Sequence, residues 1–135
     1  MNDAQMIEMY KTARTIAVVG LSTNPARAGY YVPEYMAGKG YRVIPVNPMI
    51  QQALGQKAYA DLLAVPEKVD VVQIFRPSQE VPAIVEQAIK IGAKYVWMQL
   101  GATNEEAAQS AQTAGLLVAT NKCMMVEHKR LLGTK

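Results

Sequence analysis

The stretch that decides the fold is Thr15-Ile-Ala-Val-Val-Gly-Leu-Ser-Thr-Asn-Pro-Ala-Arg-Ala-Gly29. Its apolar run, residues 16–19, stops at Gly20, and the residues that follow are almost all small or turn-forming, with one cation, Arg27. A helical pattern of apolar residues then begins at Tyr30. A buried strand that leads through a glycine turn into a helix is typical of doubly wound α/β proteins. The stretch therefore predicts a strand, a loop and a helix, in that order.

The loop that begins at Gly20 has the chemistry of a phosphate site. Glycine lets the backbone turn where a side chain would block a ligand, and the next helix offers unpaired N–H groups and a partial positive charge. Ser22, Thr23 and Arg27 can donate further hydrogen bonds to an anion. The loop matches neither the G-x-G-x-x-G fingerprint of dinucleotide sites nor the P-loop of NTPases. A strand-to-helix connection that binds no ligand stays open as the alternative.

Four further apolar runs, separated by helical patterns, accompany this stretch, and such alternation predicts a parallel sheet with right-handed connections. We expect one domain, residues 1–135, of the α/β class. Its core is expected to be a Rossmann-like, doubly wound, five-stranded parallel sheet in the order 3-2-1-4-5, with helices on both faces. The strands are expected at residues 15–19, 41–46, 69–75, 94–98 and 116–119. The helices are expected within residues 3–13, 30–39, 78–92, 103–115 and 123–132.

Local residues predict where these helices begin. Asp3 is expected to cap the first helix and Ser78 the third, and the four residues from Thr103 onward match a capping box. Pro33 is expected in the first turn of the second helix, where a missing N–H costs little. Between the second and third strands, Leu54-Gly55 predicts a turn.

The composition limits the classes of partner. The 135 residues carry a net charge of +3, and no basic run is longer than Lys129-Arg130, so a nucleic-acid partner is not expected. A small anionic ligand fits this balance better. One cysteine excludes an internal disulfide. No run approaches the roughly 20 apolar residues of a membrane span, and the first residues do not form a signal peptide, so we expect a cytoplasmic protein.

Ligands of doubly wound sheets bind outside the carboxyl ends of the strands, where the strand order reverses. Those ends are followed here by residues 20–27, 46–48, 75–78, 99–101 and 120–123. These segments supply hydroxyls, backbone donors and two arginines, but no Asp, Glu or His. General acid–base catalysis and metal binding usually need those residues. The sequence therefore predicts a site that binds a polyanion, with no catalytic residue and no metal.

The end of the second expected strand argues against a nicotinamide cofactor. In NAD-binding sheets an acid at the end of that strand, roughly 20 residues beyond the glycine loop, binds the ribose. The sequence here is Ile44-Pro-Val-Asn-Pro48, without Asp or Glu. An NAD(P)-dependent oxidoreductase therefore stays only as an alternative.

Five short motifs are spread over about residues 10–132. They are Gly20-Leu-Ser-x-x-Pro-x-Arg27, Gly40-Tyr-x-Val-x-Pro-Val-Asn-Pro48, Asp70-Val-Val-x-Ile-Phe-Arg76, Gly92-Ala-Lys-x-Val-Trp-x-Gln-Leu-Gly101 and Cys123-Met-x-Val-Glu-His128. Together they resemble the stand-alone CoA-binding domain proteins, a family similar to the amino-terminal domain of the succinyl-CoA synthetase α subunit. The resemblance implies a Rossmann-like fold that binds coenzyme A, a nucleotide cofactor, at the switch point of the sheet.

The resemblance also implies where CoA lies. The loop after the first strand would bind the pyrophosphate, the residues after the second and third strands would lie near the adenosine, and those after the fourth near the pantetheine. The implied binding residues are Gly20, Leu21, Ser22, Thr23 and Arg27 in the loop, Val46, Asn47, Phe75 and Arg76 near the adenosine, and Gln99 and Leu100 near the pantetheine.

The expected function is therefore binding of CoA or acyl-CoA without catalytic machinery of its own. The synthetase acts through a phosphorylated histidine in a second domain, which we do not find in this sequence. The one histidine, His128, matches no catalytic motif, so a structural or solvated position is expected. Cys123 is expected to be a small buried apolar residue, although a mixed disulfide with CoA stays open. An accessory subunit of an acyl-CoA ligase and an interaction module without a ligand stay open as alternatives.

Overall fold

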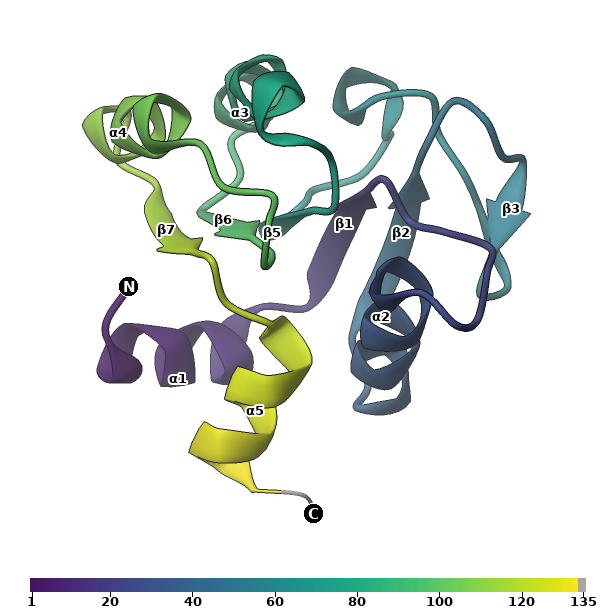
Figure 1. The fold of residues 1–135 in the computed structure, drawn as a ribbon, viewed down its shortest axis with the longest axis horizontal. Coiled ribbons are helices and arrows are strands. Elements are labelled where there is room, and N and C mark those ends of the chain that lie inside the picture. The colour runs from purple at the N-terminus through teal and green to yellow at the C-terminus, as the bar shows by residue number, and fades with distance from the viewer. Residues whose placement is uncertain (134–135) are drawn as a thin grey trace.

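The computed structural model describes residues 1–133, and its centre is a parallel sheet of five strands (Figure 1). The strands are β1 (Thr15–Val19), β2 (Arg42–Val46), β5 (Val71–Ile74), β6 (Tyr95–Met98) and β7 (Leu117–Thr120). In the middle of β1, Ala17 lies between Ile44 of β2 and Val72 of β5. Both ends of each strand lie within two residues of the expected positions, and the α/β, Rossmann-like class is confirmed.

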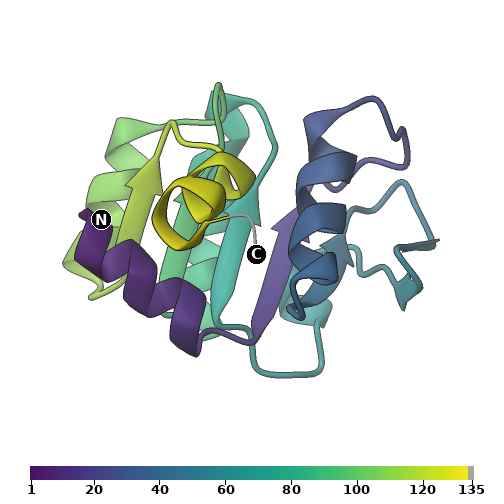
Figure 2. The same cartoon turned by 90° about the horizontal axis from the view of Figure 1, so that it is seen from below.

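Helices cover both faces of the sheet, as the sequence predicts. They are α1 (Asp3–Thr12), α2 (Ala28–Gly38), α3 (Val81–Lys90), α4 (Glu105–Thr113) and α5 (Met124–Leu132). In Figure 1, α3 and α4 lie above the sheet, and in Figure 2 the other three helices lie in front of it. Within residues 1–133, no helix combines the length and the apolar character that a membrane span needs.

Two buried clusters, one on each face, hold the helices against the sheet. The first packs α3 and α4 on the strands and includes Val72 and Val85, and the second packs α1, α2 and α5 on the opposite face and includes Val71 and Met36. Val71 and Val72 are neighbours in β5, yet they belong to different clusters. A strand that is covered on both faces must be apolar at consecutive positions. This explains why the strands are continuous apolar runs in the sequence.

In strand order the sheet differs from the expectation. The order is β2-β1-β5-β6-β7, which is 2-1-3-4-5 when the five strands are numbered along the chain, whereas 3-2-1-4-5 was expected. Pro45 explains the difference, because proline has no N–H for a further strand and belongs on edge strands such as β2. The outer edge of β2 instead accepts a single bridge, with the N–H of Tyr59 donating to the Pro45 carbonyl at 3.0 Å. In both orders the switch point adjoins β1, so the ligand is still expected beside Gly20.

The later part of the connection from β2 to β5, which includes Leu62, packs on the same face of the sheet as α3. It comprises β3 (Gln52–Ala53), β4 (Gln56–Lys57) and the helical turn η1 (Leu62–Ala64). Leu54 and Gly55 join β3 to β4 with positive φ values of 52° and 74°, as a two-residue hairpin turn requires. This confirms the turn expected there. Asp61 caps η1, since its carboxylate accepts the Ala64 N–H at 3.0 Å.

For α1 and α3 the capping residue differs from the expected one. α1 is capped by Asn2 and not by Asp3, because the Asn2 side chain accepts a backbone N–H three residues further on. α3 follows a separate turn, η2 (Ser78–Glu80), and Ser78 does not cap it. The Ser78 hydroxyl instead donates to the carbonyl of Thr103 at 2.6 Å, which ties together the loops after β5 and β6.

His128 of α5 is buried, with its ring against tyrosines of neighbouring helices. Its Nδ1 lies 2.8 Å from Oη of Tyr35, and its ring meets that of Tyr10 edge to face. Burial, and then the charge of Lys39, lower the pKa of His128 below its usual value. The ring therefore occupies a packed position between α1, α2 and α5. Cys123, just before α5, is half-buried and packs against the same cluster.

Asn104 caps α4, whereas the sequence pattern favoured Thr103. Asn104 Oδ1 accepts the Ala107 N–H at 2.9 Å, and its amide donates to the Ser78 carbonyl at 3.0 Å. We expect Asn104→Ala to lower the free energy of unfolding by about 1–2 kcal/mol, because the helix loses its N-cap. Thr103→Val is the matched control and should change it by less than about 0.5 kcal/mol, since Thr103 Oγ1 has no partner among the described residues. Urea denaturation measures both, and a larger loss in the control would contradict the assignment.

Candidate functional site

Gly20, directly after β1, lies in close contact with the residues that follow β5. Its φ is +87°, and its N–H donates to the carbonyl of Val46 in β2 at 2.9 Å. A Cβ at this position would lie 2.7 Å from Cδ of Arg76 and 2.8 Å from the carbonyl oxygen of Phe75. Only glycine fits, because the backbone conformation and the available space both exclude a side chain.

Helix α2 anchors the loop that follows Gly20. α2 begins at Ala28, two residues earlier than expected, so Pro33 lies beyond its first turn and not within it. Proline has no N–H to donate to the carbonyl four residues back, which belongs to Gly29. That carbonyl instead accepts the N–H of Ser22 at 3.0 Å. A hydrogen bond that is missing inside α2 is thereby replaced by one that holds the loop.

The loop also bonds to itself and leaves the start of α2 open. Oγ of Ser22 accepts the N–H of Asn24, and Oδ1 of Asn24 accepts the N–H of Ala26, both at 3.0 Å. The N-cap of α2 is Arg27, whose side chain makes no capping hydrogen bond. Among residues 1–133 no side chain accepts the N–H groups of Ala28 and Gly29, so these groups are available to an anion, as at phosphate sites.

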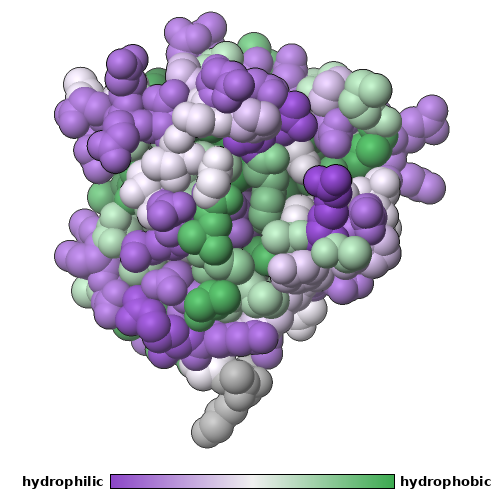
Figure 3. All heavy atoms as spheres, viewed as in Figure 1, coloured by the Kyte–Doolittle hydropathy of each residue, from purple (hydrophilic) through white to green (hydrophobic). Residues whose placement is uncertain are grey.

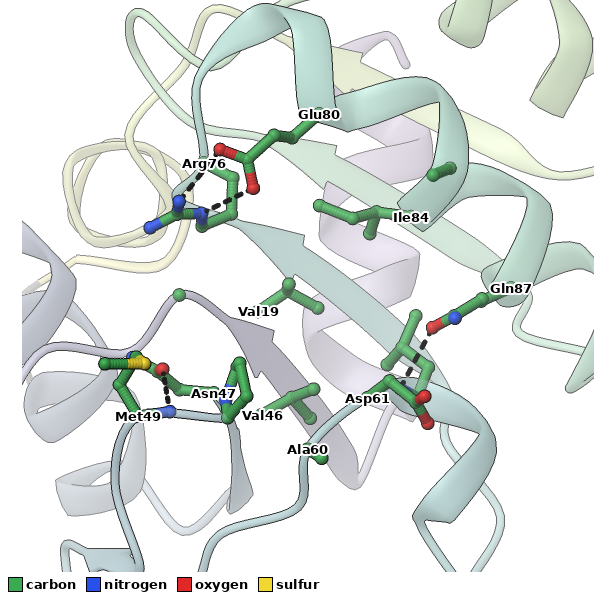
Figure 4. A pocket seen from close by; sticks show the side chains of 14 residues that line it. Val19, Val46, Asn47, Met49, Ala60, Asp61, Arg76, Glu80, Ile84 and Gln87 are labelled. Carbon is green, nitrogen blue, oxygen red and sulfur yellow. Dashed lines mark hydrogen bonds and ion pairs between the residues drawn. The ribbon is translucent and has the colours of Figure 1, made fainter.

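Two cavities open at the carboxyl ends of β1, β2 and β5. The first has a volume of about 240 Å³ and lies between these strand ends and α3, as Figure 4 shows. The second, of about 500 Å³, lies beside the loop and the start of α2. Gly20, Asn47 and Arg76 line both cavities. The walls of the first are largely apolar and include Val19, Val46, Met49, Leu62 and Ile84.

Asn47 joins the ends of β1 and β2. Its Nδ2 donates to the carbonyl of Leu21 at 3.0 Å, and its Oδ1 accepts the N–H of Met49 at 2.9 Å. Both ends of the amide are therefore engaged in shaping the walls that the two cavities share. The acid that binds the ribose in NAD-binding sheets would stand near this place, and a neutral amide stands there instead.

The two cations of the site differ in their pairing. Arg27 lines the second cavity, and its guanidinium has no hydrogen-bond or ion-pair partner within residues 1–133. Arg76 is held by Glu80, whose carboxylate accepts from Nε at 3.1 Å and from Nη2 at 2.8 Å (Figure 4). These hydrogen bonds raise the pKa of Arg76 and lower that of Glu80. One cation is free to meet an anion, and the other already has a counter-ion.

Sequence reasoning missed two carboxylates at the first cavity. Glu80 and Asp61 both line it, although neither lies directly after a strand. The expectation of a site without carboxylates is therefore wrong for this cavity. The spacing of Arg76 and Glu80, four residues apart, was a signal that could have found the ion pair. Within the part of the chain that the structure describes, no three His, Cys, Asp or Glu side chains are grouped so that they could hold a metal ion.

All but three of the implied CoA-binding residues line one of the two cavities, and the exceptions are Leu21, Gln99 and Leu100. The side chain of Leu21 is fully buried in the core. Gln99 is also buried, and its Oε1 accepts from Nε2 of Gln73 at 3.0 Å and from the N–H of Met124 at 2.8 Å. Leu100 lies on the surface after β6 with 63% of its area exposed.

Exposed apolar side chains follow β6 and begin α5. Figure 3 shows hydrophobic spheres gathered in the middle of this face, over the region where Figure 1 draws the end of β6 and the start of α5. Leu100 and Val126, both more than half exposed, belong to these segments. Because the strands are parallel, this surface lies at the same edge of the sheet as the two cavities.

Comparisons with known proteins found relatives along nearly the whole chain. A family model described as CoA binding domain matches residues 14–129. The uncharacterized protein YneT of Bacillus subtilis (strain 168) is 38% identical over 125 residues, which cover 93% of each chain. The solved structure of a hypothetical protein from Pyrococcus horikoshii OT3 has a TM-score of 0.95 and 43% identity, and the match covers 98% of this chain and 94% of that one.

A further relative is a subunit of an enzyme. The alpha subunit of ADP-forming acetate–CoA ligase II from Pyrococcus furiosus is 33% identical over 109 residues. The match covers 75% of this chain but only 23% of that subunit. The similarity therefore concerns one part of the ligase subunit.

Because of the close contact at Gly20, an alanine at this position should destabilise the fold more than an alanine at another glycine with positive φ. We expect Gly20→Ala to lower the free energy of unfolding by about 1–3 kcal/mol through the strained backbone conformation alone. The free energy should fall further because Arg76 and Phe75 must move to make room for the methyl group. Gly40→Ala is the matched control, since Gly40 has a φ of +98° but nothing within 4 Å of a Cβ. Urea denaturation should give a loss at least about 1 kcal/mol larger for Gly20→Ala. Equal losses would contradict the close approach.

Proposed function

Because this chain belongs to the family of CoA-binding domains, we propose that it binds coenzyme A or an acyl-CoA and has no catalytic machinery of its own. The observation that carries the proposal is the second cavity. An arginine without a partner within residues 1–133, Arg27, and the uncapped start of α2 line it together. A free cation beside unpaired N–H groups suits a diphosphate.

In this proposal each part of CoA has its own surface. The diphosphate lies against the loop, with donors from Ser22, Thr23 and Arg27. The adenosine lies toward the first cavity, whose apolar wall includes Val46, and near Asn47, Phe75 and Arg76. Leu21 contributes backbone atoms only, because its side chain is buried. Apolar walls with a few polar groups are the usual composition of a cofactor site.

The pantetheine arm extends along the carboxyl edge of the sheet toward Gln99 and Leu100. The support for this direction is the exposure of two apolar side chains, Leu100 after β6 and Val126 at the start of α5. Gln99 contributes through its backbone, since its side chain is buried and hydrogen-bonded. An arm with apolar methylene groups gains from covering exposed apolar area.

A second candidate is that the chain presents CoA to a partner chain that carries out the chemistry. The similarity to an acetate–CoA ligase subunit favours it, because that similarity is confined to a part of the subunit. The two candidates share the same CoA site. They differ in whether a protein partner uses the bound cofactor.

Preference for CoA over nicotinamide cofactors is the direct test of the proposal. We expect CoA and acetyl-CoA to bind and NAD and NADP to bind far more weakly, because the amide of Asn47 stands near the place of the ribose-binding acid. Isothermal titration calorimetry of the purified chain with the four ligands measures this. NAD affinity equal to or tighter than that of CoA would refute it.

Arg27 should contribute to CoA binding without contributing to stability. Arg27→Ala removes a charge-assisted hydrogen bond to phosphate, so we expect the Kd for CoA to rise by about tenfold or more. The unfolding midpoint should stay unchanged, because Arg27 is exposed and has no partner within residues 1–133. Arg14→Ala, at the opposite end of β1, is the matched control and should bind CoA as the unmodified chain does. Unchanged affinity in Arg27→Ala would show that Arg27 lies outside the phosphate site.

A further inference from the structure

Arg76 stands at the junction of the two cavities. It follows β5, lines both cavities, and its aliphatic part packs against Gly20, where a Cβ would lie 3.2 Å from Cγ and 2.7 Å from Cδ. This packing holds the base of the side chain in place. The guanidinium therefore lies between the apolar cavity and the cavity beside the loop.

The order of these surfaces matches the order of groups in a nucleotide. The apolar walls of the first cavity, such as Val19 and Ile84, suit a base, and the loop with Arg27 suits a diphosphate. In a nucleotide the ribose lies between base and diphosphate. The position of Arg76 between the two cavities is therefore the position of the ribose, and the ribose of CoA carries a phosphate.

Glu80 occupies one edge of the Arg76 guanidinium and leaves another free. Its carboxylate accepts from Nε and Nη2, so both hydrogens of Nη1 and one of Nη2 remain. In Figure 4 the third nitrogen of Arg76 points away from Glu80. The free edge, formed by Nη1 and Nη2, can still take two oxygens of a phosphate in the fork geometry that arginine favours.

We infer that Arg76 binds the ribose phosphate of CoA through the edge that Glu80 leaves free, and that Glu80 limits the strength of this bond. The inference rests on the proposed CoA function and adds to it a preference for a ligand with a phosphate on its ribose. A carboxylate that shares the guanidinium cancels part of its charge and repels the incoming phosphate. Arg76 therefore favours CoA over dephospho-CoA, which lacks this phosphate, and Glu80 reduces that preference.

The two residues make opposite contributions, and this separates recognition from a structural ion pair. Loss of Arg76 should remove the preference for CoA, whereas loss of the Glu80 charge should increase it. An ion pair that only stabilises the fold would change stability in both variants and leave the ratio of the two affinities unchanged. Both side chains are nearly half exposed, at 43% and 46%, so the fold does not depend on their pairing.

The experiment is calorimetric titration with CoA and with dephospho-CoA. For the unmodified chain we expect the Kd for CoA to be lower by about tenfold or more. Arg76→Met keeps the aliphatic stem that packs on Gly20 but removes the charge. It should bring the ratio of the Kd for dephospho-CoA to the Kd for CoA down to about one. Glu80→Gln keeps the shape of the side chain and should raise the ratio at least about threefold. Circular dichroism verifies that both variants are folded.

The outcomes separate this inference from the proposed function. Binding of neither ligand to the folded, unmodified chain would overturn both. Binding of CoA and dephospho-CoA with equal affinity would overturn the inference alone and leave the CoA function standing. A ratio that falls in Glu80→Gln, or that is unchanged in Arg76→Met, would also overturn it.

Discussion

The close contact between Gly20 and the residues after β5 is the constraint on which the rest of the site depends. β1 and β5 are hydrogen-bonded neighbours, and the helices that follow them, α2 and α3, cover opposite faces of the sheet. Their loops therefore diverge at this contact and leave the crevice in which ligands of such sheets bind. A Cβ on Gly20 would collide with Arg76 and Phe75, so one methyl group would alter the junction between the two cavities.

Hydrogen bonds to backbone groups hold the loop in its form. Pro33 leaves the Gly29 carbonyl without a helical donor, and the N–H of Ser22 satisfies it. Side chains inside the loop accept two further backbone N–H groups, those of Asn24 and Ala26. The two arginines of the site differ, since Arg27 has no partner within residues 1–133 and Arg76 is paired with Glu80. Together these features support the proposed binding of an anion.

Local patterns in the sequence were sufficient for the elements and for much of the site. The strands are apolar at consecutive positions because both faces of the sheet are covered, and that pattern gave their positions to within two residues. Gly20 and Gly55 mark turns with positive φ values, which residues other than glycine rarely adopt. Apart from Leu21, whose side chain is buried, the residues implied around the loop and the ends of β2 and β5 line the cavities, because they lie at or after the carboxyl ends of parallel strands that end at the same edge.

By itself, then, the sequence determined the fold class, the strands and the loop, because periodicity and turn chemistry act between residues that are close in the chain. Only the tertiary structure decided that β5 lies beside β1, that Ser78 bonds to Thr103 and does not cap a helix, and that Glu80 and Asp61 reach the first cavity. Pro45 carried a hint of the strand order, since proline belongs at an edge. The physical reason is that strand neighbours, competing hydrogen-bond partners and cavity walls come from groups far apart in the chain, which meet only when the sheet and its helices have packed.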